Sequence, residues 1–138
     1  MAALATAALF TWFGMVIAIS FVEAPLKFRA PGVTRALGLG IGRLVFRALN
    51  VAEIVLAAIA VIALGTGRDT GATWIPVAVA VVCLLVQVAL VRPRLDRRAA
   101  RIIAGEDVEP SRAHLGYVAL EGVKVIALVV AGALAAAA

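Results

Sequence analysis

Ionisable and amide side chains interrupt the long apolar stretches of this 138-residue chain. A charged residue near the centre of a membrane-spanning helix costs about 2.5–3.5 kcal/mol on insertion scales, so it usually has a partner or a function. One apolar stretch holds Asn50 and Glu53, three residues apart, and another holds Gln87. A further stretch carries four polar residues at spacings of three, four and three, which place them on one helix face: His114, Tyr117, Glu121 and Lys124.

These polar residues have a structural and a functional interpretation. In the structural one, Lys124 neutralises Glu53 or Glu121, while Asn50 and Gln87 join helices through hydrogen bonds. In the functional one, the residues form a pocket that opens to the cytoplasm and binds a cation, a proton or the head group of an amphiphile. The functional interpretation requires Glu53 and Glu121 to face each other across a cavity that reaches water.

The composition places these residues in a membrane protein. Apolar residues make up 64% of the chain and charged residues 15%, whereas a soluble globular protein has about 45–50% and about 25%. This composition excludes a soluble single domain, a disordered chain and a disulfide scaffold. At about 20 residues per crossing, the chain is long enough to cross a bilayer about four times. The lone cysteine, Cys83, excludes an intrachain disulfide, and no set of zinc ligands is present.

We therefore predict an all-α, polytopic membrane protein with one transmembrane domain over residues 1–138, a bundle of four transmembrane helices. The four spans cover about 2–23, 44–64, 74–91 and 115–137, and the loops 24–43 and 92–114 join them. Thr34 predicts the N-cap of a helix that lies in the membrane interface and continues into the second span. Gly38 and Gly42 are typical of a close helix contact.

The basic residues predict the orientation of the spans. One lysine or arginine, Arg68, lies between the second and third spans, and Lys124 lies within the fourth. The other eleven lie in or beside the two longer loops: Lys27, Arg29, Arg35, Arg43, Arg47, Arg92, Arg94, Arg97, Arg98, Arg101 and Arg112. The positive-inside rule then places both loops in the cytoplasm and both termini outside it, with the protein in the inner (plasma) membrane.

The same residues indicate partners. Basic loops beside membrane spans contact anionic lipid headgroups, so we expect membrane lipids as partners and no nucleic acid. A homo-oligomer or a membrane partner is an open alternative. In that case the chain is an accessory or structural subunit, which docks a partner through Ala57 and Val61 or through Ala127 and Ala131.

Several short motifs resemble the uncharacterised four-helix membrane family related to transmembrane protein 205. They cover most of the chain: Trp12-Phe13-Gly14, Glu23-Ala24-Pro25-Leu26-Lys27-Phe28-Arg29, Gly42-Arg43-Leu44-Val45-Phe46, Arg92-Pro93-Arg94-Leu95 and His114-Leu115. The resemblance implies a fold and a topology. By analogy with the eukaryotic member, which is linked to drug tolerance, it also implies transport or trafficking.

A second resemblance raises an enzyme alternative. The run Arg47-Ala48-Leu49-Asn50-Val51-Ala52-Glu53 is similar to the Arg-Ala-x-x-Asn-x-x-Glu motif of the MAPEG membrane glutathione enzymes, although Arg47 lies one residue too close. This resemblance implies a trimeric, glutathione-dependent enzyme. The residues themselves offer no Ser/His/Asp set, no paired metal ligands and one histidine, so we expect no catalytic residues and no cofactor.

The sequence thus predicts a small membrane protein that binds or transports a small cationic or amphiphilic solute. The predicted binding residues are those of the polar set: Asn50, Glu53, Gln87, His114, Tyr117, Glu121 and Lys124.

Overall fold

A computed structural model describes residues 1–67, 71–109 and 111–138, and all regular structure in these ranges is helical. Four helical segments are long and apolar enough to cross a membrane, which confirms the predicted fold class. The first and third segments each consist of shorter pieces. In chain order the elements are α1 (Ala2–Val16), η1 (Ile17–Glu23), α2 (Ala24–Leu26), η2 (Lys27–Arg29), α3 (Arg35–Thr66), α4 (Trp74–Val86), η3 (Gln87–Val91), α5 (Arg92–Ile103) and α6 (Ala113–Ala137).

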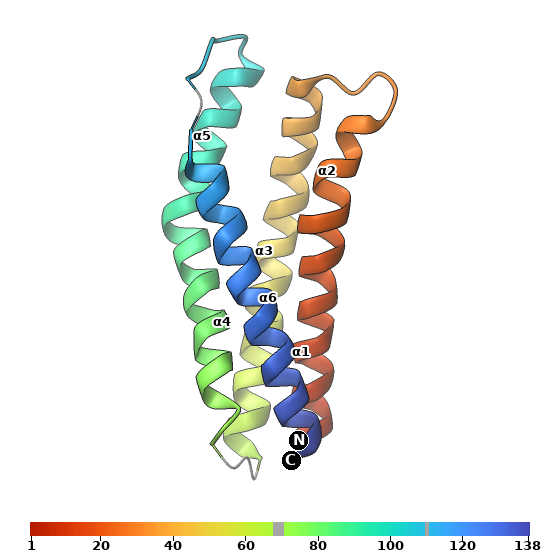
Figure 1. The fold of residues 1–138 in the computed structure, drawn as a ribbon, viewed down its shortest axis with the longest axis vertical. Helices are drawn as coiled ribbons and strands as arrows, with labels where there is room; N and C mark the ends of the chain where they lie inside the picture. The colour runs from red at the N-terminus through yellow and green to blue at the C-terminus, as the bar shows by residue number, and fades with distance from the viewer. Residues whose placement is uncertain (68–70, 110) are drawn as a thin grey trace.

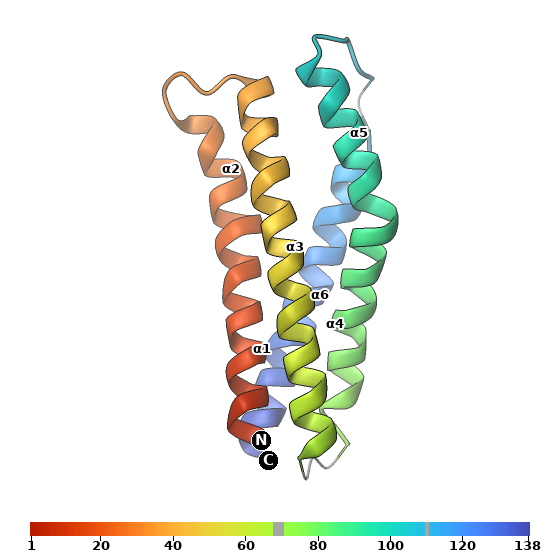
Figure 2. The ribbon, with the colours of Figure 1, turned by 180° about the vertical axis from the view of Figure 1, so that it is seen from behind.

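The helices run lengthwise, and the two chain ends lie together at one end of the bundle (Figure 1). The opposite end, which we call the basic end, carries residues 24–43 and 92–114. The most extensive packing joins α1 to α3, α1 to α6 and α4 to α6. Because α6 crosses the bundle diagonally, it lies beside α1 near the termini and stands apart from α2 at the basic end (Figures 1 and 2).

Two π-helical turns each precede a proline. The turn η1 ends two residues before Pro25, and η3 ends two residues before Pro93. Proline lacks an N–H, and its ring clashes with the carbonyl four residues earlier, so a wider turn before it lets a helix continue. The first helical segment therefore runs on to Arg29, beyond the Glu23-Ala24-Pro25 sequence at which the composition predicts its end.

The helix α3 begins at the predicted cap, because the Thr34 hydroxyl accepts a hydrogen bond from the Leu37 N–H at 3.1 Å. Residues 35–43 were expected to form a helix in the membrane interface. They are helical, but they continue straight into the span along the bundle axis (Figure 2). With 32 residues, α3 is about 48 Å long, whereas the hydrocarbon core is about 30 Å thick. The helix α3 is therefore longer than one crossing of that core requires.

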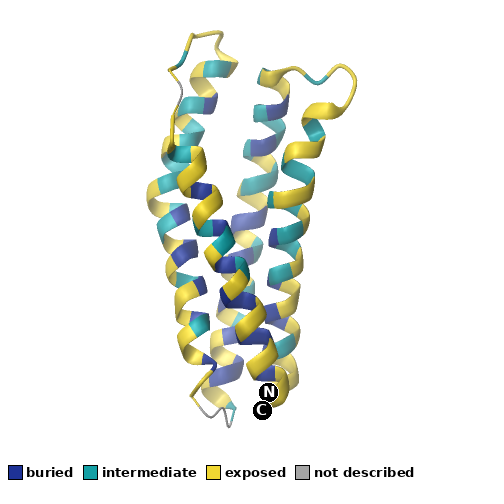
Figure 3. Ribbon diagram, in the orientation of Figure 1, coloured by how far each residue is buried: buried dark blue, intermediate teal, exposed yellow. Residues whose placement is uncertain are grey.

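The apolar core lies on the inward faces of the helices, mainly in the half of the bundle that holds the termini (Figure 3). Three of the four residues expected to dock a partner are buried in this core, namely Ala57, Ala127 and Ala131. The prediction that they form an external docking face is wrong, because their small side chains let this chain's own helices pack closely. Large apolar side chains such as Ile75 and Ile126 face outward, as in a multi-pass membrane protein. Arg68, which was predicted to lie between the second and third spans, is outside the described residues.

Candidate functional site

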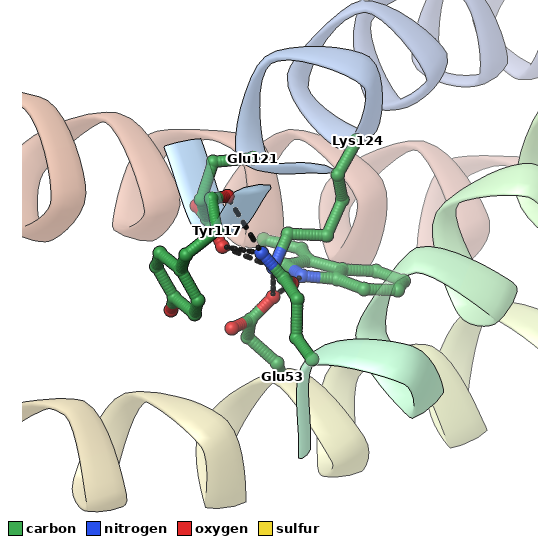
Figure 4. A network of polar contacts seen from close by, with 6 residues as sticks. Glu53, Tyr117, Glu121 and Lys124 are labelled. Atoms are coloured by element: carbon green, nitrogen blue, oxygen red, sulfur yellow. Dashed lines mark hydrogen bonds and ion pairs between the residues drawn. The ribbon is translucent and has the colours of Figure 1, made fainter. Parts of the chain in front are cut away.

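A buried ammonium group lies at the centre of the polar cluster. The Lys124 Nζ of α6 lies 2.5 Å from Glu53 Oε2 of α3 and 2.8 Å from Glu121 Oε1 (Figure 4). It also donates a hydrogen bond to Gln87 Oε1 of η3 at 2.8 Å. A lysine ammonium has three donors, and here each donor has an acceptor within hydrogen-bond distance. Lys124 and Glu53 are both 0% exposed.

Two further donors complete the cluster. Gln87 Nε2 donates to Glu121 Oε1 at 2.7 Å and to the Tyr117 carbonyl at 3.4 Å. Trp12 Nε1 of α1 donates to Glu53 Oε2 at 2.6 Å. Each of the four membrane-spanning segments therefore contributes at least one side chain to the cluster. Trp12 was not among the predicted site residues, although its position in the middle of an apolar run was a signal, since tryptophans usually lie at the ends of spans.

The cluster is closed around Lys124. Glu53 and Glu121 both contact this ammonium, as in the structural interpretation. Four of the predicted site residues each have one buried oxygen without a hydrogen-bond partner within the described part of the chain: Asn50 Oδ1, Glu53 Oε1, Tyr117 Oη and Glu121 Oε2. Asn50 was predicted to join helices through hydrogen bonds, but its Oδ1 accepts none from the described residues. His114 is exposed and lies apart from the cluster.

A cavity of about 660 Å³ lies at the basic end, between α2, α3, α5 and α6 and next to the cluster. Its wall on α6 runs from His114 to Glu121, a length of about 10 Å at 1.5 Å per residue. Among the predicted site residues, His114, Tyr117 and Glu121 line the cavity. The other four, Asn50, Glu53, Gln87 and Lys124, are not among its described lining residues.

Cations outnumber acids in the cavity wall, which holds five lysines and arginines and two acidic residues. One of the two acids, Glu121, is already paired with Lys124. The other, Asp96, lies on α5 near Arg92 and Arg98 in the sequence. The cavity is therefore electropositive, although most of its wall is apolar.

Two of these cations lie over the same aromatic ring. The Arg92 guanidinium lies 4.4 Å from the Phe46 ring centroid and 4.6 Å from that of Tyr117. The Lys27 Nζ lies 5.7 Å from the Phe46 centroid. The Phe46 and Tyr117 rings meet edge to face at 5.7 Å. Sequence reasoning used Lys27 and Arg92 as signals of orientation and of contact with anionic lipid, because no spacing connects them to an aromatic residue on another helix.

Two glycines of α3 leave room for the side chains of Lys27 and Phe28. A Cβ added at Gly42 would lie 3.2 Å from Lys27 Nζ, and one at Gly38 would overlap the Phe28 ring. The two glycines predicted to form a close helix contact therefore let η2 pack against α3. In the described ranges, no group of three His, Cys, Asp or Glu residues is placed to hold a metal ion.

Comparison with known proteins gives one family match. Residues 7–102 match a family model described as "Domain of unknown function (DUF4149)". The matched region includes Trp12, Lys27, Glu53, Gln87 and Arg92, and it ends before α6. No curated protein and no solved structure matches the chain. The match confirms an uncharacterised family, while the relationships to transmembrane protein 205 and to the MAPEG enzymes stay predictions.

Proposed function

The chain belongs to the DUF4149 family, and we propose that this membrane protein binds one amphiphile in the cavity at its basic end. The observation that carries this proposal is the cavity itself, whose wall runs from the buried Glu121 to Arg98 and Ser111 near the end of the bundle. A cavity with mostly apolar walls and several charged side chains matches the two parts of an amphiphile.

The size and lining of the cavity support this proposal. Ligand sites usually have volumes of about 300–1,000 Å³, mostly apolar walls and a few placed polar groups, and this cavity of about 660 Å³ is of that kind. Phe21, Leu39 and Val118 supply apolar wall from three different helices.

The polar cluster has a structural role in this proposal. Lys124 neutralises one of the two carboxylates of Glu53 and Glu121, and cations outnumber acids among the described residues of the cavity wall, so a cationic solute would meet net positive charge there. The geometry therefore favours the amphiphilic part of the predicted solute class over the cationic part. The closed cluster also gives no support to a path along the bundle axis, so we propose binding and do not extend the proposal to transport.

The membrane side is part of the proposal. Eleven lysines and arginines lie in or beside the loops at the basic end, which supports a cytoplasmic basic end, an inner-membrane location and extracytoplasmic termini. The cavity would then take its ligand from the cytoplasmic leaflet. The motif resemblance to the family of transmembrane protein 205 is consistent with this topology.

A second candidate is an accessory subunit of a membrane complex. The observation that favours it is the closed cluster, which shows how the polar residues can serve stability alone. The glutathione-enzyme alternative has less support, because Glu53 is 0% exposed and hydrogen-bonded to Trp12. A residue in that position is not available to a soluble cosubstrate.

A matched pair of substitutions tests amphiphile binding. Leu39→Trp fills the cavity, whereas Leu44→Trp makes the same change at an exposed position that is not among the described lining residues of the cavity. Native mass spectrometry in a neutral detergent would count bound amphiphiles from a panel with anionic, zwitterionic, uncharged and cationic head groups. We expect the wild type and Leu44→Trp to keep one amphiphile and Leu39→Trp to lose it. Equal retention by all three proteins would contradict the proposal.

A further inference from the structure

The ligand class can be specified further, in an inference that rests on the proposed function. We propose that the amphiphile is anionic and that Arg92 and Lys27 bind its head group, a phosphate or a similar oxyanion. Three observations carry this inference: unused donors on Arg92, the position of Lys27, and the charge balance of the cavity.

Arg92 has donors that the protein does not use. Its Nε and Nη2 atoms are buried and have no hydrogen-bond partner in the described part of the chain. The rings of Phe46 and Tyr117 contact the guanidinium by cation–π interactions, and these contacts leave the Nε and Nη2 N–H groups free for an acceptor. Leaving a buried donor unpaired is unfavourable. A planar guanidinium also fits a phosphate or carboxylate with two parallel hydrogen bonds.

Lys27 brings a second cation to the same place. Its side chain is 10% exposed, and its acidic contact is Glu23 of the same helical segment, at 3.4 Å. Its Nζ lies over the Phe46 ring, which the Arg92 guanidinium also contacts. Two cations on different helices therefore converge on one ring, although like charges repel. An oxyanion between them would relieve this repulsion.

The remaining charges of the wall favour an anion as well. Arg35, Arg43 and Arg98 add positive charge, and Asp96 is the acid of the described wall that is not paired with Lys124. A cationic head group would meet repulsion here, and an uncharged one would leave the Arg92 donors unpaired. The chemistry that fits is an oxyanion with several acceptor oxygens. The source is either the head group of a lipid or a free phosphate ion.

Two ligands that differ in the phosphate alone test the inference. We would compare lysophosphatidic acid with the monoacylglycerol of the same acyl chain, by native mass spectrometry of the full-length protein in a neutral detergent. The wild type should bind the phosphate-bearing ligand about tenfold or more tightly. Arg92→Gln should lower that ratio at least about threefold while binding of monoacylglycerol is retained. Arg97→Gln, an exposed change on the same helix outside the described cavity wall, should leave the ratio unchanged.

The other outcomes separate the two proposals. Equal affinity of the wild type for both ligands would overturn the anionic head group and leave amphiphile binding intact. The same loss in Arg97→Gln as in Arg92→Gln would also overturn it, because the effect would then be nonspecific. If Arg92→Gln does not fold, Arg92→Lys and Lys27→Gln test the same ratio.

Inorganic phosphate distinguishes the two sources of the anion. If phosphate raises the thermal unfolding temperature of the wild type but not of Arg92→Gln, and neither acyl ligand binds, then the anion site stands and the proposed amphiphile function fails. If phosphate displaces lysophosphatidic acid at equal concentration, the lipid as the source is overturned. Retention of lysophosphatidic acid in millimolar phosphate supports the lipid.

Discussion

Lys124 Nζ lies 2.5 Å from Glu53 Oε2, and both side chains are fully buried. This ion pair joins α6 to α3 inside an apolar bundle, where a membrane interior offers no water as an alternative partner. Because Glu121 and Gln87 also accept hydrogen bonds from this ammonium, three contacts depend on one residue. The pair holds the helices together beneath the cavity and closes the cluster to solutes.

Replacing Lys124 with methionine should destabilise the protein strongly. The change keeps much of the side-chain volume but leaves Glu53 and Glu121 without their shared cation. Removing one partner of a buried ion pair costs about 3–5 kcal/mol, and circular dichroism should record a clear decrease in the thermal unfolding temperature in detergent. The double variant Lys124→Met/Glu53→Gln should be more stable than Lys124→Met, because it removes one unpaired carboxylate. An unfolding temperature equal to that of the wild type would contradict the role of Lys124.

Trp12→Phe should also reduce stability, but less. The phenylalanine keeps an aromatic ring in the core and loses the hydrogen bond to Glu53, which is worth about 1.5–3 kcal/mol if the carboxyl is charged. Trp74→Phe is the matched control, since Trp74 is 37% exposed at the start of α4. Thermal unfolding should therefore separate the two variants. Equal losses would show that the indole N–H of Trp12 contributes nothing specific.

Two glycines on α3 should respond to alanine in opposite directions. A Cβ at Gly38 would overlap the Phe28 ring, whereas one at Gly40 would meet nothing within 4 Å. Gly40→Ala should stabilise α3 by up to about 1 kcal/mol, because alanine has the higher helix propensity. Gly38→Ala should lower the unfolding temperature, as the contact between η2 and α3 is displaced. If both variants are stabilised, the close packing of η2 on α3 is not maintained in the membrane protein.

The topology makes a prediction that does not depend on ligand binding. A reporter that is active in the cytoplasm should be inactive when it is fused after Ala138 and active when it is inserted after Asp107, in the loop at the basic end. The physical reason is the retention of basic loops on the cytoplasmic side. The reverse pattern would place the cavity on the outer leaflet.

The sequence predicted part of the polar cluster, and the reason is helix geometry. The spacing of Glu121 and Lys124 by three residues places them on one face, and they are in contact in the structure. The structural interpretation also offered Glu53 as a partner of Lys124, and these two residues are in contact. Which helix faces meet could not be predicted, because this depends on how α6 crosses the bundle and on the packing of α1. The contribution of Trp12 follows from that packing.

Most of the cavity wall was beyond the reach of sequence reasoning for a related reason. Lys27 and Arg92 are local neighbours of Pro25 and Pro93, and the two π-helical turns that accommodate these prolines also rotate the residues that follow. A periodicity of 3.6 residues carried through Ile17–Glu23 or Gln87–Val91 therefore misplaces the faces beyond these turns. The fold class is insensitive to this error, because four long apolar stretches specify four helices. Which residues line the cavity, in contrast, depends directly on the helix faces beyond these two turns.

The most direct test of the account is photolabelling with an anionic lipid that carries a diazirine on its acyl chain. The labelled peptides would be mapped by mass spectrometry on protein reconstituted in vesicles of zwitterionic lipid. The account predicts label on the cavity-lining residues Leu39 and Val118 that an excess of unlabelled anionic lipid removes. Label confined to outward residues such as Leu44 and Ile126, without competition, would contradict the binding of an amphiphile in the cavity.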